Sequence, residues 1–195
     1  MLEYDVEAAH YDATRGGAPR AAAAAQAVRR LVPVHGQVLD IAGGTGIVSQ
    51  QVVLGSSAAV TVLDLSHGML RKAAERLPGR QVQGDATALP IASGSVDLVT
   101  AIWLLHLIDD AAPVVAEAAR VLGAGGAFVT TVDKNAAHGH RDPATGPVDG
   151  LARLTELASG HGLTLTGTTT FEGLGQQRPD GAMPVFTVAA FARPA

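Results

Sequence analysis

The residues best suited to chemistry in this sequence gather around one glycine-rich turn. Asp40 lies in the apolar run 38–41, and Gly43, Gly44 and Gly46 follow it closely. Glycine allows positive φ and lets a ligand approach the main chain, while the first N–H groups of a following helix remain unpaired. The pattern therefore predicts a buried strand, a tight turn and a helix that together bind a small ligand.

The charge beside this turn separates two classes of cofactor. A dinucleotide site needs G-x-G-x-x-G, and Ser49 stands where the third glycine would be. The Asp40 carboxylate would repel a pyrophosphate, whereas it would attract an ammonium and a sulfonium group. The sequence therefore favours S-adenosylmethionine over NAD.

Residues 40–46 resemble the first motif of class I S-adenosylmethionine-dependent methyltransferases, which has an acid, any residue and then alternating glycines. Ala42 stands where the first glycine often occurs, and alanine still allows close approach. The resemblance implies that Asp40, Ala42, Gly43, Gly44 and Gly46 bind the cofactor. Two alternatives stay open, namely an NAD-dependent oxidoreductase and a domain that binds S-adenosylmethionine without transferring a methyl group.

Length and composition bound the remaining possibilities. The 195 residues suit a single domain, 1–195, and the net charge of −4 gives no electrostatic footprint for nucleic acid. The absence of cysteine excludes disulfides and thiolate metal sites. The longest apolar run, 98–108, is too short to span a bilayer, and the start of the chain is acidic where a signal peptide would be basic. We therefore expect a soluble cytoplasmic protein with no membrane partner.

Short apolar runs alternate with amphipathic segments along most of the chain, which predicts an α/β fold with right-handed crossovers. The expected class is a Rossmann-like, doubly wound, mostly parallel seven-stranded sheet with an antiparallel C-terminal strand pair, as in the family resembled. The expected helices are 19–31, 46–54, 68–77, one from about 110 to 122, and 147–159. The expected strands are 38–41, 59–65, 81–84, 95–103, 127–132, 163–171 and 184–191.

The first 33 residues are predicted to form an arm and a helix over the cofactor site. In the family resembled, a Tyr-Asp-x-x-Arg stretch folds over the methionine end of the cofactor, which implies that Tyr11 and Arg15 contact its carboxylate. A guanidinium suits this role because its planar fork donates two hydrogen bonds to a carboxylate. A solvated arm is the alternative.

A second motif follows the second predicted strand. Asp64 ends that strand, where an acid can accept hydrogen bonds from both ribose hydroxyls. Ser66 is placed to cap the next helix. Residues 64–70 also resemble the second motif of menaquinone and ubiquinone biosynthesis methyltransferases, which implies that Leu65 and Met69 lie near the adenosine. A plain core position is the alternative for Met69.

Two further strand ends are expected to contact the cofactor. In the family resembled, an acid at the position of Asp85 accepts a hydrogen bond from the adenine amino group, and we place Gly84 and Ala86 beside it. A turn or helix cap is the alternative role for Asp85. Ile102 and Trp103 end the fourth strand and are also expected to bind the cofactor.

His106 is the candidate general base. It follows the fourth strand, where the family resembled often has a histidine near the methyl group, and imidazole titrates near neutrality. Methyl transfer needs a base only when the nucleophile must lose a proton. A histidine that only packs or orients the acceptor is the alternative.

The acceptor is expected to be a small molecule. The polar rim loop 134–147 contains His138 and His140, which we assign to substrate contact or to a solvated loop. His138, His140 and Asp133 could bind a metal, but no fourth ligand is evident, so no metal is expected. No Asn/Asp-Pro-Pro-Tyr stretch follows the fourth strand, unlike in methyltransferases that act on nucleic acid bases. The short rim loop either leaves the acceptor site open or lets the partner subunit of a homodimer complete it.

Overall fold

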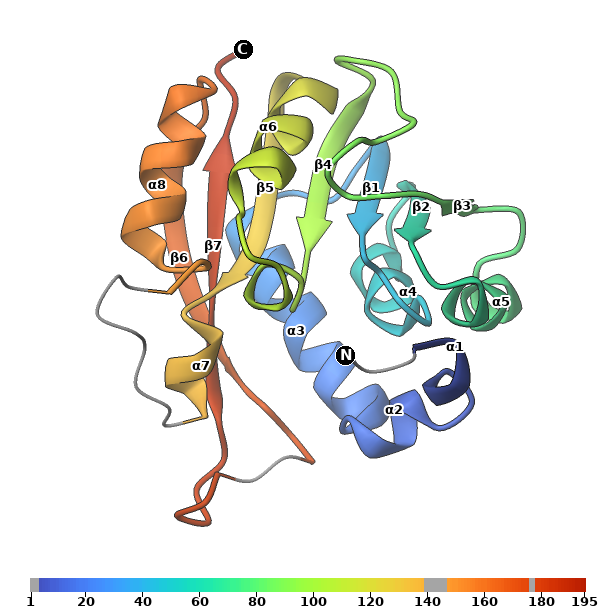
Figure 1. Cartoon of the computed structure of the whole chain (residues 1–195). Helices are drawn as coiled ribbons and strands as arrows, with labels where there is room; N and C mark the ends of the chain where they lie inside the picture. The colour runs from blue at the N-terminus through green and yellow to red at the C-terminus, as the bar shows by residue number, and fades with distance from the viewer. Residues whose placement is uncertain (1–3, 139–146, 176–177) are drawn as a thin grey trace.

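The computed structural model describes residues 4–138, 147–175 and 178–195. Its centre is a seven-stranded sheet with the strand order β3-β2-β1-β4-β5-β7-β6 and helices on both faces (Figure 1). β1 to β5 are parallel, and β7 runs antiparallel to both β5 and β6. The predicted fold class is confirmed, including the reversed C-terminal pair.

The elements lie close to their predicted bounds. The strands are β1 (Gln37–Ile41), β2 (Ala59–Asp64), β3 (Gln81–Gln83), β4 (Val96–Ala101), β5 (Leu122–Val132), β6 (Thr164–Glu172) and β7 (Val185–Ala192). The helices are α1 (Tyr4–Glu7), α2 (Tyr11–Thr14), α3 (Gly17–Leu31), α4 (Ile47–Val53), α5 (His67–Arg76), α6 (Ala112–Val121), α7 (Lys134–Ala137) and α8 (Leu151–Gly160), with a 3₁₀ turn η1 (Leu105–Leu107).

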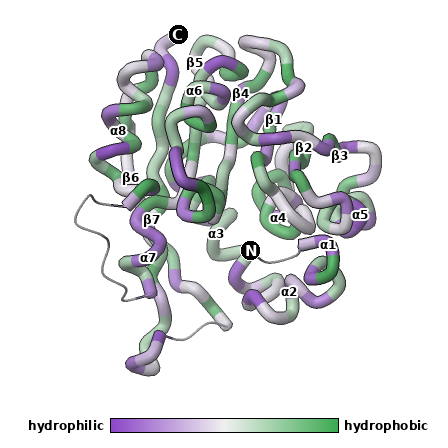
Figure 2. Tube along the Cα trace, viewed as in Figure 1, coloured by the Kyte–Doolittle hydropathy of each residue, from purple (hydrophilic) through white to green (hydrophobic). Residues whose placement is uncertain are grey.

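Two large hydrophobic cores cover the two faces of the sheet, and a small third cluster joins β2 to α5. Neighbouring residues of β1 point to opposite faces, so Val38 packs with α3 and α4 while Leu39 packs with α6 and α8. Figure 2 shows mainly green and white along the central strands and more purple on α5 and α7. Central strands buried on both faces are typical of a parallel sheet covered by helices. No helix in the described ranges is long and apolar enough to cross a membrane.

The strand order reverses at β1. The chain proceeds outward from β1 to β2 and β3 and then returns to β4, which lies on the other side of β1. Ligands in open α/β sheets bind at such a switch point, outside the carboxyl ends of the strands. The fold therefore places the glycine turn after β1 at the expected ligand crevice.

Several elements differ from the prediction. β4 ends at Ala101, before Ile102 and Trp103, and α7 lies in the segment that was expected to be a rim loop. The first 18 residues show no clear period in the sequence, yet they contain α1 and α2. Gly123, Gly125 and Gly126 do not separate α6 from β5, because Leu122 already adopts an extended backbone and the glycines lie inside the strand. A side chain at Gly126 would approach the Asp97 carbonyl oxygen to 3.0 Å, so the glycines allow close strand contact there. α8 begins at Leu151 instead of residue 147.

Two acids attach the N-terminal arm to α5 and the glycine turn. Asp5 of α1 accepts hydrogen bonds from the Ser66 hydroxyl and the Gly68 N–H, each at 2.6 Å. Asp12 of α2 forms an ion pair with Arg76 at 2.6 Å and accepts a hydrogen bond from the Thr45 hydroxyl at 2.6 Å. The arm therefore lies over the carboxyl ends of β1 and β2 (Figure 1).

We expect Arg76→Met to loosen this arm while leaving the sheet intact. The variant removes the ion pair to Asp12 and the hydrogen bond from Arg76 to the Thr45 carbonyl. A partly buried ion pair with a hydrogen bond contributes about 1–2 kcal/mol, so the amides of residues 4–15 should exchange about tenfold faster with solvent. Hydrogen exchange followed by mass spectrometry measures this directly, with peptides from β4 and β5 as an internal reference.

Arg30→Met is the matched control, because Arg30 is an exposed arginine on α3. It should leave exchange of residues 4–15 unchanged. Equal effects of both variants, or no effect of Arg76→Met, would show that other contacts hold the arm.

Candidate functional site

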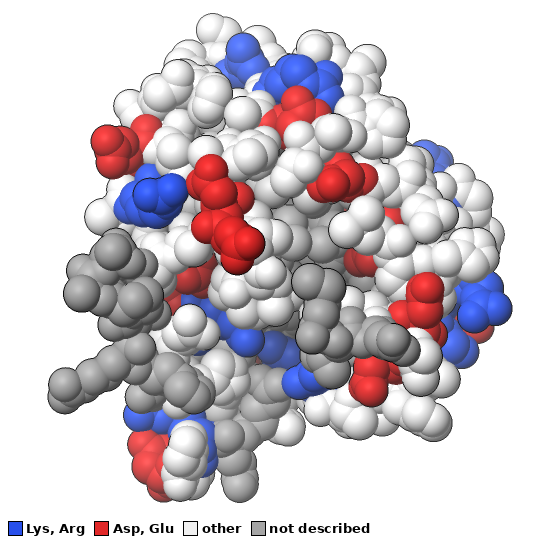
Figure 3. Space-filling model, in the orientation of Figure 1, with Lys and Arg blue, Asp and Glu red and all other residues white. Residues whose placement is uncertain are grey.

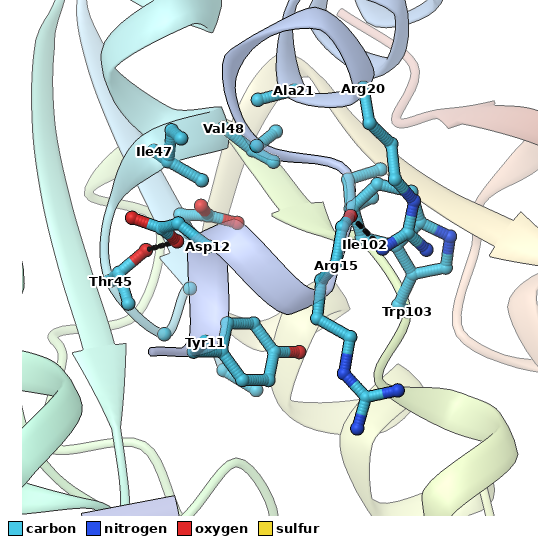
Figure 4. A pocket seen from close by; sticks show the side chains of 15 residues that line it. Tyr11, Asp12, Arg15, Arg20, Ala21, Thr45, Ile47, Val48, Ile102 and Trp103 are labelled. Atoms are coloured by element: carbon cyan, nitrogen blue, oxygen red, sulfur yellow. Dashed lines mark hydrogen bonds between the residues drawn. The ribbon is translucent and has the colours of Figure 1, made fainter. Parts of the chain in front are cut away.

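A pocket lies where the N-terminal arm, the glycine turn and the end of β4 meet (Figure 4). It includes several residues that the sequence predicted for cofactor binding, namely Tyr11, Arg15, Asp40, Ala42, Gly43, Gly44, Ile102 and Trp103. The remaining lining residues were not predicted and are Asp12, Gly17, Arg20, Ala21, Thr45, Ile47 and Val48. The structure therefore brings the first motif and the arm together in one pocket.

The glycine turn has no room for larger residues. A Cβ atom at Gly43 would lie 2.8 Å from both Asp40 Oδ2 and Val62 Cγ1. Gly46 has a φ of +71°, and a Cβ there would lie 3.1 Å from the Cβ of Ala73 on α5. Gly46 thus permits the glycine turn to pack closely against α5.

Asp40 lies at the base of the pocket with both carboxylate oxygens engaged. The Ser49 hydroxyl donates to Oδ2, and the Thr100 hydroxyl donates to Oδ1 at 2.7 Å. The residue is only 2% exposed, and this burial raises the pKa of Asp40 to about 6, even though both hydrogen bonds favour the charged form. Ser49, which the sequence showed only as a missing glycine, therefore holds the carboxylate in place.

Asp64 joins the end of β2 to the glycine turn. Its Oδ2 accepts a hydrogen bond from the Gly44 N–H and its Oδ1 accepts one from the Ser66 N–H, both at 2.9 Å. Burial raises the pKa of Asp64 above its usual value, and the backbone donors oppose that rise. The Gly84 N–H donates to the Asp64 carbonyl at 3.1 Å, so the end of β3 lies beside the end of β2.

Leu65 and Met69 differ in their access to a ligand. Leu65 is 66% exposed beside Asp64, whereas Met69 is 1% exposed. The Met69 sulfur lies 3.9 Å from the position that a Cβ of Gly44 would take. Met69 therefore supports the glycine turn from beneath, which matches its alternative role as a core residue.

Asp85 is exposed and forms a local turn. Its Oδ1 accepts hydrogen bonds from the N–H and the hydroxyl of Thr87, both at 2.8 Å, and these bonds lower the pKa of Asp85. A turn or cap of this kind is the alternative role that the sequence predicted for Asp85. Both hydrogen bonds from Thr87 go to Oδ1 and neither goes to Oδ2. Gly84 and Ala86, on either side, are half-buried.

Arg20 is the most notable pocket residue that sequence reasoning missed. Its guanidinium carbon lies 3.6 Å from the centre of the Trp103 ring, and Nη1 donates to the Arg15 carbonyl at 3.0 Å. Burial, and to a smaller extent the charge of Arg15, lowers the pKa of Arg20 to about 10. The available signal was helical spacing, because Arg20 lies on the same face of α3 as the buried Ala24 and Ala27.

Trp103 takes an unusual backbone conformation beside Arg20. Its φ is +64°, and its backbone N–H donates a hydrogen bond to the Thr131 hydroxyl at 2.8 Å. The ring also packs edge to face with Phe171 and Phe186. Ile102, the preceding residue, is buried against the α3 and α4 core.

His106 lies on η1, just beyond the end of β4. It is half-buried, and burial lowers its pKa to about 3, with further lowering by the charges of Lys134, His138 and Arg20. The imidazole is therefore neutral at physiological pH. His138 packs edge to face on Phe186 with 5.5 Å between ring centres, and His140 lies outside the described residues.

The two ends of the site differ in charge. Asp40 and Asp64 lie at the ends of β1 and β2, whereas Arg15 and Arg20 line the pocket together with Trp103. Figure 3 shows basic side chains gathered between the region of α7 and that of α2. Within the described part of the chain, no group of three or more histidine, aspartate or glutamate residues is placed to hold a metal ion.

Comparison with known proteins identifies a methyltransferase domain over residues 39–130. A ubiquinone/menaquinone biosynthesis C-methyltransferase of Desulfotalea psychrophila is 41% identical over 101 residues, which are 50% of this chain and 41% of that protein. A malonyl-[acyl-carrier protein] O-methyltransferase of Methylococcus capsulatus is 31% identical over 137 residues, covering 68% of this chain and 50% of that protein. The chain thus spans about half or less of these relatives.

Solved structures show the same fold at lower sequence identity. A chain in the complex between the Haloferax volcanii Trm112 methyltransferase activator and a methyltransferase aligns with a TM-score of 0.77 and 21% identity, covering 100% of this chain and 99% of that one. Haemonchus contortus phosphoethanolamine N-methyltransferase 2, bound to phosphomonomethylethanolamine and S-adenosylhomocysteine, aligns with a TM-score of 0.70 and 17% identity, covering 98% of this chain and 58% of that one.

The matched segment begins in β1 and ends in β5, so it includes the glycine turn, Asp64 and the end of β4. The fold and the first motif agree with this match. Residues 39–130 of the chain therefore match a methyltransferase domain, and its relatives in this segment include enzymes named as methyltransferases.

Proposed function

We propose that the protein transfers a methyl group from S-adenosylmethionine to a small-molecule acceptor by direct displacement. The observation that carries the proposal is the glycine turn, which lines the pocket together with Asp40 and donates a hydrogen bond from Gly44 to Asp64. An acid at each end of the turn suits a ligand with a ribose on one side and cationic groups on the other. The match of residues 39–130 to a methyltransferase domain supports the same chemistry.

Each part of the cofactor has a proposed position. The ribose hydroxyls bind Asp64, and the adenine lies against Leu65, Asp85 and Ala86 near Gly84. The ammonium and sulfonium groups lie above the glycine turn and Asp40, between Ile102 and Trp103. The pocket arginines Arg15 and Arg20 face the methionine carboxylate, and a guanidinium can hold a carboxylate by two hydrogen bonds.

The arm closes the site in this proposal. The whole chain, 1–195, acts as one domain in which α1, α2 and α3 cover the methionine end of the cofactor. Tyr11 and Arg15 both line the pocket, and the Arg15 guanidinium lies 5.7 Å from the centre of the Tyr11 ring. Displacement of a sulfonium needs alignment of nucleophile, methyl and sulfur, and a cover that excludes water.

The acceptor binds on the Trp103 and His106 side, near His138. The matched relatives include enzymes named for C-methylation in quinone biosynthesis and for O-methylation of a malonyl-[acyl-carrier protein], so both carbon and oxygen nucleophiles occur among them. Since the chain spans half or less of those proteins, their acceptors are not transferred to it. This side of the site is either open to solvent or completed by a second copy of the chain. Neither nucleic acid nor a membrane is proposed as a partner.

Calorimetry with S-adenosylhomocysteine and with NAD tests the proposal. We expect the purified chain to bind S-adenosylhomocysteine and not NAD. Asp64→Asn should weaken binding about tenfold or more, because an amide accepts the ribose hydrogen bonds less strongly than a carboxylate and costs about 1.4 kcal/mol or more.

Asp97→Asn provides the matched control for Asp64→Asn. Asp97 accepts a hydrogen bond from the Gln37 N–H at the opposite ends of the strands, so its change should leave the affinity unaltered. Binding of NAD in place of S-adenosylhomocysteine would reject the proposed cofactor. Binding without release of S-adenosylhomocysteine from S-adenosylmethionine in any acceptor screen would favour a domain that binds but does not methylate.

Asp40→Asn should stabilise the free protein while weakening cofactor binding. The folded-state pKa of about 6 lies above the ordinary value of 3.8, so the folded protein loses stability as pH rises between these values. Removing that charge should raise the free energy of unfolding at pH 8 by up to about 3 kcal/mol, and much less near pH 4, where Asp40 is already protonated. Urea unfolding at both pH values measures the difference.

Thr100→Val serves as the opposing control, because it leaves the Asp40 carboxylate buried with one donor fewer. It should lower stability at pH 8. A loss of stability in Asp40→Asn that is the same at both pH values would show that its hydrogen bonds outweigh the cost of burying its charge.

His106→Ala tests the proposed base. If His106 accepts a proton from the nucleophile, turnover should fall by about 100-fold while the affinity for S-adenosylhomocysteine changes little. Because its pKa lies near 3, the wild-type rate should show no step from this histidine between about pH 5 and 8. Steady-state kinetics across this range, with calorimetry, provide the measurements.

His161→Ala controls for loss of a histidine, since His161 is exposed at the end of α8. Restoration of turnover by His106→Gln would assign an orienting role instead of a base. Equal losses of turnover and cofactor affinity in His106→Ala would show that His106 is not a catalytic residue.

A further inference from the structure

We propose that Thr131 is a positioning residue that, through Trp103, orients the Arg20 guanidinium toward the methionine carboxylate of the cofactor. The inference rests on the proposed function, which places Arg20 opposite that carboxylate. It deepens the proposed function by naming the residues that hold this arginine in place. The pocket lining includes Arg20 and Trp103 but not Thr131, so Thr131 acts through its neighbours.

The first link is the hydrogen bond that the Trp103 backbone N–H donates to the Thr131 hydroxyl at 2.8 Å. β4 ends at Ala101, and its register with β5 ends at the pair Ala101 and Thr130. Beyond this pair, the Trp103 N–H bonds to a side chain of β5 in place of the β5 backbone. Thr131 is only 1% exposed, so its hydroxyl has little freedom to turn toward solvent.

This hydrogen bond holds a backbone conformation that tryptophan rarely adopts. The φ of Trp103 is +64°, in the left-handed region that favours glycine. Such a conformation persists only where the surrounding contacts hold it. Ile102, the preceding residue, is 7% exposed and packs in the core beneath α3 and α4, which fixes the other side of the turn. The direction of the indole therefore depends on the bond to Thr131.

The indole of Trp103 is a platform for Arg20. Phe171 of β6 and Phe186 of β7 pack edge to face on the indole, with 5.8 Å and 5.7 Å between ring centres. The Arg20 guanidinium carbon lies 3.6 Å from the centre of the Trp103 ring, and Figure 4 shows the two side chains together. Indole attracts a cation more strongly than other aromatic side chains do. The phenylalanines thus fix the plane of the indole, and the indole fixes the plane of the guanidinium.

Stacking leaves the N–H edge of the Arg20 guanidinium available to a ligand. A guanidinium donates hydrogen bonds in its own plane, whereas stacking uses its face. Nη1 donates to the Arg15 carbonyl at 3.0 Å, and Nε is buried without a hydrogen-bond partner. The ion pairs among the described residues do not include Arg20. An acid in place of Trp103 would orient Arg20 but compete with the cofactor carboxylate, whereas an indole orients Arg20 without neutralising it.

Two ligands that differ in one group measure how well Arg20 is positioned. S-adenosylhomocysteine and its decarboxylated form share the adenosine, the sulfur and the amine, so the ratio of their dissociation constants reports the carboxylate. By calorimetry, the wild type should prefer S-adenosylhomocysteine about tenfold or more, because its carboxylate accepts charge-assisted hydrogen bonds. Thr131→Val should reduce this preference to about threefold or less, while the affinity for the decarboxylated form stays within about twofold of wild type.

Fluorescence reports the first link directly, because Trp103 is the only tryptophan in the chain. Thr131→Val should shift the emission of the free protein to longer wavelength, since a released indole is more exposed to water. Thr131→Ser keeps the hydroxyl and should restore both the emission and the carboxylate preference. Thr130→Val is the matched control, because Thr130 is 0% exposed and its hydroxyl donates to the Ala101 carbonyl at 2.8 Å. It should leave both measurements close to wild type.

A double-mutant cycle tests whether Thr131 acts through Arg20. Arg20→Met removes the cation and should itself reduce the carboxylate preference. In that background, Thr131→Val should cause no further reduction, since two changes that act through the same contact are not additive.

Three outcomes would overturn the inference. An unchanged carboxylate preference in Thr131→Val would do so, whether or not the emission shifts. Additive losses in the double variant would show that Thr131 does not act through Arg20, and equal effects of Thr130→Val and Thr131→Val would assign a general packing role. Failure of the wild type to bind S-adenosylhomocysteine would instead count against the proposed function, and an unshifted emission in Thr131→Val would then reject the first link as well.

Discussion

The buried carboxylate of Asp40 is the constraint on which the rest of the site depends. It belongs to β1, and its two hydroxyl donors, Ser49 and Thr100, belong to α4 and β4. A single side chain thus joins the three elements that meet at the switch point of the sheet. Its burial is unfavourable for the free protein, as the raised pKa shows. Such a cost is typical of a group retained for ligand binding, because a core residue of similar size would avoid it.

Backbone strain marks the same edge of the sheet. In the described part of the chain, the non-glycine residues with positive φ are Ala42, Trp103 and Asp133, which follow β1, β4 and β5. Each such conformation costs about 1 kcal/mol or more and persists only where surrounding contacts hold it. These residues turn the chain at the carboxyl ends of neighbouring strands. The strain is therefore concentrated around the pocket, where exact placement of the backbone matters more than stability.

The sequence predicted the strands and the glycine turn well because both depend on local pattern. Local sequence alone identifies the apolar runs of strand length, the glycines and Asp64. Their order along the chain then determines where the strand ends meet. Ser49 and Arg20 show what local pattern omits. The partner of Ser49 lies nine residues earlier, and the partner of Arg20 is Trp103, so their roles appear only after folding. The short helices of the arm were missed for the same reason, since their stability comes from contacts such as Asp12 with Arg76.

In the proposed function, the separation of charges across the pocket gives each end of the site a different part in methyl transfer. The sulfonium becomes a neutral thioether during the reaction, so a carboxylate touching it would stabilise the reactant more than the transition state. Asp40 avoids this effect in part, because its two oxygens are directed to the hydroxyls of Ser49 and Thr100. Arg20, on the opposite side, faces the methionine carboxylate in the proposed function, and that carboxylate keeps its charge while the methyl group leaves. In the proposed function, the fold therefore holds the cofactor at three places, through its ribose, through the glycine turn and through its carboxylate.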